Sequence, residues 1–324
     1  MSTPSPLHMR VADYLAERRR LGYALRAHDT LLADFADFIT EQHRDGPLTA
    51  DLMVVWAQRA RAGHGTRESW YRRLQRLRPF IRYLQQFEPD TEVPEDGIFG
   101  PEPGRVAPHI YHQEEIVALL DATRHLGPAG NLRSATYEAL FGLLAATGLR
   151  VSEAIHLLEC DVDLTSGLLS VRESKCGKSR QVPLHPSAVE ALRRFRRRRC
   201  REVASAHETP FFTGCGRRHL GKPLGDRQVH RVFNQLRDRL GWRNRGAHES
   251  PRLHDLRHTF AVRRLMLWHR DGVDLDQRML ALATYLGHVK IKDTYWYLTA
   301  VPELMALAAD TFERFVAGTE GGDA

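Results

Sequence analysis

Apolar residues in the first part of the chain recur with the period of an α-helix. This spacing predicts helices over residues 13–28, 31–42, 50–62 and 66–87, and Thr49 is suited to cap the third. The last is the clearest, because an apolar stripe from Trp70 to Phe87 returns every three or four residues. The other faces of this helix carry basic residues, which indicates either the solvated side of a helical bundle or a phosphate-binding surface. The basic residues on these faces are Arg67, Arg72, Arg73, Arg76, Arg78 and Arg82.

The composition changes between Pro89 and Pro108, where five prolines and three glycines fall within 20 residues. Neither a helix nor a strand persists at this density, so the segment predicts a connector between two domains. We therefore expect a helical domain over residues 1–95, a linker over 96–110, a second domain over 111–316 and a flexible tail over 317–324.

The second part combines helical periodicity with one strand signal. Helices are predicted over residues 111–125, 135–146, 186–204, 226–240, 253–268, 276–286 and 302–316. Two short runs, 168–173 and 180–184, flank a polar turn and predict a β-hairpin. The expected fold is mainly α with a small β-hairpin or sheet, in which a helical bundle precedes a mixed α+β domain.

Composition adds information about partners. The 324 residues are 42% hydrophobic, which is enough to bury a core and excludes disordered and fibrous classes. Residues 1–110 carry 15 basic and 15 acidic side chains, so the formal net charge of +7 falls entirely in the second part. Such an excess is compatible with a polyanionic partner, although surplus arginine on a solvated surface is the commoner explanation.

Several protein classes lack support in the sequence. The longest apolar stretch, residues 139–149, is shorter than the ~18 residues that span a bilayer, and we expect neither a membrane segment nor a secretory signal. The four cysteines have no zinc-binding spacing, which is typical of reduced thiols in a cytoplasmic protein. No glycine-rich nucleotide-binding loop is present, so no nucleotide cofactor is expected.

Three segments and the hairpin contain side chains suited to phosphate chemistry. The segments are TGLRVSE, LHDLRHTF, and LGH with a tyrosine nine residues after its histidine. Taken singly each is a weak signal, since an arginine paired with a glutamate three residues on is usually structural. The candidate residues are Arg150, Lys175, His254, Arg257, His288 and Tyr297.

In order and local context, these six residues resemble the active site of the tyrosine recombinase (phage integrase) family. The hairpin ESKCGKSRQVPL, the helix RLHDLRHTFA and the segment YLGHVKIKDTYWYL each match a family motif. The resemblance covers residues 111–316 and implies a SAM-like, helical core-DNA-binding domain followed by a mixed α+β catalytic domain. The segment TYWYLTAVPELMALAA is more similar to integrases of transposons and other mobile elements than to chromosome-dimer resolvases.

The resemblance implies site-specific DNA recombination through a covalent 3′-phosphotyrosine intermediate formed by Tyr297. Arg150 and Arg257 would hold the non-bridging phosphate oxygens, the two histidines of the set would hydrogen-bond the phosphate or move protons, and Lys175 would protonate the leaving 5′ hydroxyl. The phosphotyrosine keeps the bond energy and the cations replace a metal, so no metal, ATP or other cofactor is implied.

Alternatives remain at several positions. His258 is expected to be structural, and Lys178 lies in the same turn as Lys175, which fits the family pattern better. Tyr295 points about 200° from Tyr297 on a helix, so the gap of nine residues selects Tyr297. Residues expected to bind DNA are Lys178, Arg180, Arg72, Arg73 and Arg76.

The expected partner is double-stranded DNA at specific recombination sites, enclosed by the two domains. The resemblance implies a free monomer and a homotetramer on paired sites, with exchange of a C-terminal helix over residues 302–316 as a further possibility. A catalytically silent DNA-binding accessory protein or regulator on the same scaffold, or a type IB topoisomerase-like enzyme, are the alternative functions.

Overall fold

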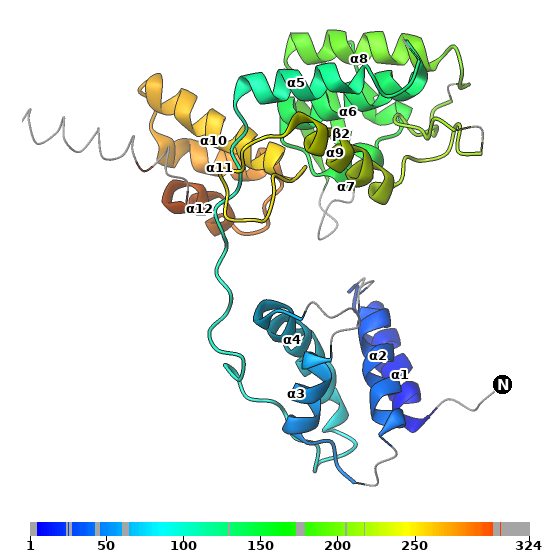
Figure 1. Cartoon of the computed structure of the whole chain (residues 1–324), viewed down its shortest axis with the longest axis vertical. Coiled ribbons are helices and arrows are strands. Elements are labelled where there is room, and N and C mark those ends of the chain that lie inside the picture. Colours follow the sequence, from blue (N-terminus) through cyan, green and yellow to red (C-terminus); the bar gives the residue numbers. More distant parts are fainter. Residues whose placement is uncertain are drawn as a thin grey trace, which may run out of the picture. The chain divides into compact units, whose positions relative to one another are not determined.

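The computed structural model of the protein describes residues 5–23, 25, 28–42, 46–59, 65–128, 130–172, 179–204, 206–216, 218–300 and 305. The chain divides into two compact units, Met1–Arg105 and Val106–Ala324 (Figure 1). The division falls within the Pro/Gly-rich connector, and the predicted combination of a mostly helical chain with a small sheet is confirmed.

The described residues of the N-terminal unit form four helices: α1 (Pro6–Arg20), α2 (His28–Glu41), α3 (Ala50–Gln58) and α4 (Arg67–Leu84). Helix α4 contacts each of the other three, and its predicted apolar stripe forms one side of the core. Phe35 of α2 and Trp56 of α3 pack edge to face with ring centroids 5.1 Å apart. The periodicity of the sequence therefore identified the buried faces.

The first helix differs from its prediction. It covers Pro6–Arg20, whereas the sequence pattern indicated residues 13–28. Proline is tolerated in a first helical turn because the N–H groups there have no partner within the helix. Gly22, at a φ of +87°, leaves the helical conformation soon after the last turn.

The start of the connector packs against the N-terminal unit. No helix or strand lies between α4 and α5 (Gln113–Thr123), a segment that the structure describes throughout. Arg78 of α4 is 4% exposed, donates to the carbonyl of Pro94 at 3.0 Å and pairs with Asp96. Arg78 therefore neither lies on a solvated face nor faces a phosphate, and both expectations were wrong for this residue.

The C-terminal unit consists mainly of helices. Besides α5 they are α6 (Leu132–Thr147), α7 (Val151–Ile155), α8 (Pro186–Arg199), α9 (Asp226–Leu240), α10 (Asp255–Arg270), α11 (Leu275–Leu286) and α12 (Lys292–Ala300). Helix α6 contacts α5, α7, α8 and α10, and Figure 1 shows α5, α6 and α8 running beside one another. The sequence predicted α9 residue for residue, whereas the expected helix over 302–316 lies outside the described residues except for Met305.

The sheet has one strand more than the predicted hairpin. Strands β1 (Val162–Asp163), β2 (Leu168–Val171) and β3 (Arg180–Pro183) are antiparallel and adjacent in chain order. Leu169 lies opposite Val162 on one side and Val182 on the other, and all three are buried. Strand β1 is only two residues long, which is too short for an alternating pattern to identify.

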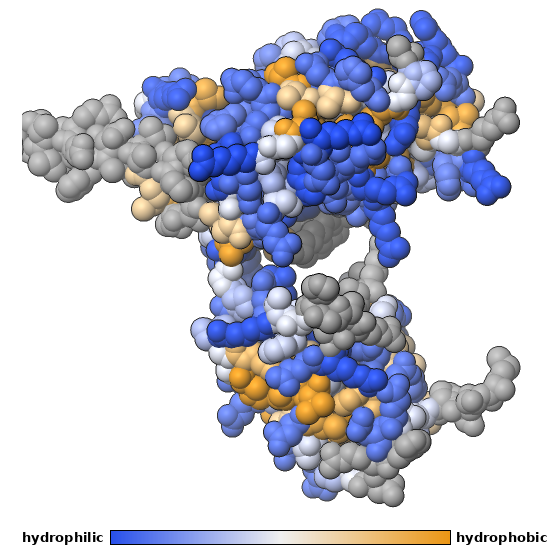
Figure 2. Space-filling model, in the orientation of Figure 1, coloured by the Kyte–Doolittle hydropathy of each residue, from blue (hydrophilic) through white to orange (hydrophobic). Residues whose placement is uncertain are grey.

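The surface is mainly hydrophilic in the view of Figure 2. Within the described ranges, no helix is long and apolar enough to cross a membrane. Cys160, Cys200 and Cys215 are free thiols, and Cys176 lies outside the described residues. The same part of the chain contains no group of three or more His, Cys, Asp or Glu side chains that could hold a metal ion.

Candidate active site

Arg150 lies directly before α7, after the turn that ends α6. Gly148 closes α6 at a φ of +62°, and a Cβ added there would lie 2.7 Å from the Phe260 side chain, so both conformation and space require glycine. The Arg150 guanidinium donates to the carbonyl of Gly287 at 3.0 Å and to Glu153 at 2.7 Å. These bonds fix Arg150 against the C-terminal end of α11.

Glu153 connects Arg150 to the sheet. Its two carboxylate oxygens accept hydrogen bonds from Arg180 at 3.1 and 2.9 Å, and the Arg150 backbone N–H donates at 2.9 Å. Burial alone would raise the pKa of Glu153, but these bonds and the two positive charges lower it to about 2. Arg180, expected to bind DNA, is 10% exposed and also donates to the carbonyl of Tyr285 at 2.8 Å. In this geometry Arg180 positions Glu153.

Arg257 is buried in the first turn of α10. It donates to the carbonyls of Gly148 at 2.8 Å and Leu286 at 2.7 Å, at the C-terminal ends of α6 and α11, where helix dipoles favour positive charge. Burial and then the nearby charge of Arg150 lower the pKa of Arg257 to about 10. Arg257 forms no ion pair with a carboxylate of the described residues, so an anion placed here would relieve the repulsion between the two guanidinium groups.

His254 is the residue immediately before α10. It is exposed to solvent, yet enough protein surrounds its ring for desolvation, together with the charges of Arg257 and Arg252, to lower its pKa to about 4. The imidazole is therefore neutral at neutral pH and offers one donor and one acceptor nitrogen.

His288 and Tyr297 lie beside each other after α11. The Nδ1 atom of His288 is 2.7 Å from the hydroxyl of the buried Thr294, which fixes the orientation of the imidazole. The rings of His288 and Tyr297 are stacked with centroids 6.4 Å apart. Tyr297 is 1% exposed, and it interacts electrostatically with Arg257. The structure thus brings together five of the six candidate residues, and the sixth, Lys175, lies outside the described residues with Lys178.

The other tyrosine of α12, Tyr295, lies away from this cluster. Tyr295 is 36% exposed, and its hydroxyl donates to Asp276 of α11 at 3.2 Å. Tyr297, by contrast, packs in a hydrophobic cluster built by α10 and α11. This placement agrees with the choice of Tyr297 from its distance to His288.

The sequence analysis did not identify two partners of the site. His258 was expected to be structural, yet its Nδ1 atom lies 2.9 Å from the Tyr297 hydroxyl. Thr294 had no sequence signal, because its role depends on the fold of the segment after α11. For His258 a signal existed, since it follows His254 by four residues and therefore shares its helix face.

The three arginines of α4 that were expected to bind DNA differ in their contacts. Arg73 donates to Asp34 at 2.9 Å and lies over the Trp56 ring, so it is engaged within its own unit. Arg72 and Arg76 are exposed, and Arg72 pairs with Glu68 on the same helix.

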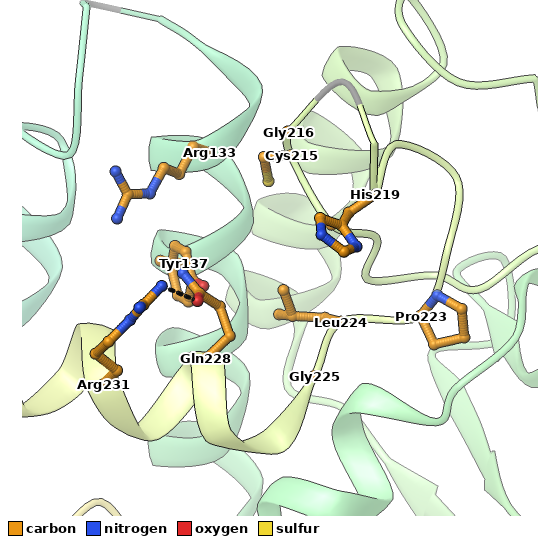
Figure 3. Close-up of a pocket in the computed structure, with 11 residues that line it drawn as sticks. Arg133, Tyr137, Cys215, Gly216, His219, Pro223, Leu224, Gly225, Gln228 and Arg231 are labelled. Atoms are coloured by element: carbon orange, nitrogen blue, oxygen red, sulfur yellow. Dashed lines mark hydrogen bonds between the residues drawn. The ribbon is translucent and has the colours of Figure 1, made fainter.

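A basic pocket of about 600 Å³ lies between α6, the N-terminal end of α9 and the loop before α9 (Figure 3). Its lining includes Tyr137 and Leu224, both buried, and the polar side chains of Arg133, His219 and Arg231. Figure 3 shows Arg231 hydrogen-bonded to Gln228, and neither Arg133 nor Arg231 forms an ion pair with a described carboxylate.

Comparisons with known proteins agree with this geometry. The sequence profile of the phage integrase family matches residues 110–303. A Sinorhizobium fredii protein named as an integrase/recombinase, y4rB, is 38% identical over 315 residues, which are 96% of this chain and 98% of that protein. The tyrosine recombinase XerC of Chromobacterium violaceum is 30% identical, over 89% of this chain and 88% of that protein. The chain therefore belongs to the phage integrase family of tyrosine recombinases, which are enzymes of site-specific DNA recombination.

Solved structures share the fold. The Tn1549 transposon integrase in complex with transposon right end DNA has a TM-score of 0.62 at 16% identity, over 95% of this chain and 98% of that one. A lambda integrase tetramer bound to a Holliday junction has a TM-score of 0.61 at 19% identity, over 88% and 77% of the two chains.

Proposed function

We propose that the residues of this site cut and rejoin double-stranded DNA by the attack of Tyr297 on a scissile phosphate. The Tyr297 oxygen bonds to phosphorus as the bond to the 5′ oxygen breaks, which leaves a 3′-phosphotyrosine and a free 5′ hydroxyl. Arg150 and Arg257 bind the non-bridging oxygens and stabilise the charge that develops on them. Lys175 donates the proton that the 5′ oxygen takes up.

The observation that carries this proposal is the pair of arginines beside the buried tyrosine. Arg257 is fixed by two carbonyl oxygens and Arg150 by a carbonyl and Glu153, so both are held in place before a substrate arrives. Preorganised donors of this kind typically contribute about 100- to 1,000-fold each to the rate. His254 and His288, both near this pair, hydrogen-bond the same phosphate.

DNA contacts outside the cleavage site involve both units in this proposal. Exposed Arg72 and Arg76 of α4 contact the backbone from the N-terminal unit, and Lys178 does so from the hairpin turn. In the basic pocket, Arg133 and Arg231 bind a phosphate, because they are cations without carboxylate partners in the described structure. The protein acts in the cytoplasm, for a mobile element, as a tetramer on two paired sites.

Covalent capture of DNA tests the function. A site is first selected from a random DNA library with the Tyr297→Phe variant, and a copy with a nick close to the scissile phosphate is then given to each protein. Wild type and Tyr295→Phe should form a covalent adduct, whereas Tyr297→Phe should form none. Tyr295→Phe is a matched control, because it also removes a tyrosine hydroxyl from α12 but leaves that of Tyr297 in place.

Other outcomes would point to the alternatives. If wild type binds the selected site but forms no adduct, the chain is a DNA-binding accessory protein. If it relaxes supercoiled plasmids that lack the site as fast as plasmids that carry it, the activity is that of a topoisomerase.

A further inference from the structure

His258 contacts the tyrosine that attacks DNA, yet the proposed function gives His258 no role. It follows Arg257 on α10 and is half-buried. Its Nδ1 atom lies 2.9 Å from the hydroxyl oxygen of Tyr297, 39 residues away in the chain. Three rings surround its imidazole at centroid distances of 4.9 to 5.9 Å, those of His254, Trp296 and Tyr297.

The imidazole of His258 is neutral in this environment. Burial lowers its pKa most, and His254 and the cations Arg252 and Arg257 lower it further, to about 2. A neutral imidazole has one acceptor nitrogen, and a tyrosine hydroxyl can donate to it. The 2.9 Å contact therefore fits a hydrogen bond from the hydroxyl to Nδ1, with the ring proton on Nε2.

Cleavage requires a group that takes the tyrosine proton. A phenol is almost fully protonated at neutral pH, and its oxygen becomes a strong nucleophile only as the proton leaves. Tyr297 is 1% exposed, so bulk water is a poor acceptor for it. Binding of a DNA phosphate adds negative charge beside Arg150 and Arg257, which offsets the positive field at His258 and makes its nitrogen more basic.

We propose that His258 is a catalytic residue that orients the Tyr297 hydroxyl through Nδ1 and accepts its proton during attack. As the bond from the Tyr297 oxygen to phosphorus forms and the bond to the 5′ oxygen breaks, the phenolic proton moves to His258, and a separate donor protonates the 5′ oxygen. During rejoining the 5′ hydroxyl attacks phosphorus and gives its proton back to that donor, while the bond from phosphorus to the Tyr297 oxygen breaks and His258 returns its proton to the tyrosine. This inference rests on the proposed function, because it assigns a role in the same reaction.

Single-turnover cleavage of the nicked site tests it with three substitutions. In His258→Asn the amide oxygen can take the position of Nδ1, in His258→Gln it reaches the position of Nε2, and His258→Phe keeps a ring without an acceptor. We expect His258→Phe to slow adduct formation by about 100-fold or more, a typical effect of losing a positioned base. His258→Asn should recover at least part of this loss and His258→Gln should not. DNA affinity should stay within a few-fold of wild type in all three.

A leaving-group experiment separates this role from packing. Replacing the bridging 5′ oxygen of the scissile phosphate by sulfur gives a leaving group that needs no proton, which should not rescue His258→Phe because the tyrosine proton must still be removed. His125→Phe, an exposed histidine at the end of α5, is the control and should cleave at the wild-type rate.

Three results would overturn the proposal. These are equal cleavage by His258→Phe and wild type, equal recovery in the Asn and Gln variants, or full rescue of His258→Phe by sulfur. Failure of wild type itself to form an adduct would instead remove the proposed function, and with it this role.

Discussion

The carboxylate of Glu153 lies 2.7 Å from the guanidinium of Arg150 and also accepts the backbone N–H of the same residue. Glu153 is thus both a cap of α7 and the carboxylate that orients Arg150, while Arg180 binds it from the sheet. One buried carboxylate therefore organises the cationic side of the site.

Substituting Glu153→Gln should lower stability and activity together. The variant leaves the nearly buried Arg180 without a charged partner, and losing hydrogen bonds to charged groups costs about 1.5–3 kcal/mol of unfolding free energy. Urea denaturation measures this change, and adduct formation should slow because Arg150 loses its orientation. Glu190→Gln, on the exposed face of α8, is the control and should change neither. An unaltered cleavage rate would show that Glu153 has no part in placing Arg150.

Stability should depend on pH in two windows. His254 and His258 have pKa values of about 4 and about 2 in the folded protein against 6.5 ordinarily, so the unfolded chain binds more protons below pH 6.5. Stability then falls as the pH drops from 6.5 towards 4. Glu153, with its pKa lowered from 4.5 to about 2, contributes stability above pH 4.5 that is lost as the pH falls towards 2.

Urea midpoints measured at successive pH values test this expectation. In His258→Asn the urea midpoint should change less with pH between 6.5 and 4 than in wild type. In Glu153→Gln it should change less below pH 4.5. A wild-type midpoint that stays constant from pH 7 to 4 would contradict the environment described for the two histidines.

Gly148→Ala should lower the stability of the folded protein more than Gly241→Ala does. Both glycines close a helix in the left-handed conformation, with φ values of +62° and +60°, and alanine in that conformation costs about 1–2 kcal/mol. An added Cβ at Gly148 also meets Phe260 at 2.7 Å, whereas at Gly241 nothing lies within 4 Å. Thermal unfolding of the two variants measures the difference, and equal losses would mean that the packing around Gly148 adjusts freely.

The double variant Arg133→Ala, Arg231→Ala should weaken DNA binding and its dependence on salt. Each phosphate contact that is lost reduces the slope of log K against log salt concentration by about 0.9. Titrations at several salt concentrations measure the slope. Arg197→Ala removes an exposed arginine that pairs with Glu190 on α8, and it should leave the slope unchanged. An unchanged slope in the double variant would exclude the basic pocket from the DNA interface.

Local sequence patterns predicted most of the secondary structure, and the order and local context of six residues selected the candidate site. The stripe on α4 and the full extent of α9 follow from helical periodicity, because a helix repeats its buried face every three to four residues. The placement of Tyr297 in the site, with Tyr295 facing away, agrees with what helix geometry alone predicts.

Only the tertiary structure decided which groups these residues contact. Arg180 was expected to bind DNA but pairs with Glu153, and His258 was expected to be structural but contacts the tyrosine hydroxyl. Arg257 binds carbonyls 109 and 29 residues away, at the ends of two helices. Periodicity encodes which face of an element is buried, but hydrogen bonds between distant segments depend on where each helix ends and how the helices pack. Sequence therefore determined the reactive groups, and the fold determined how they are held.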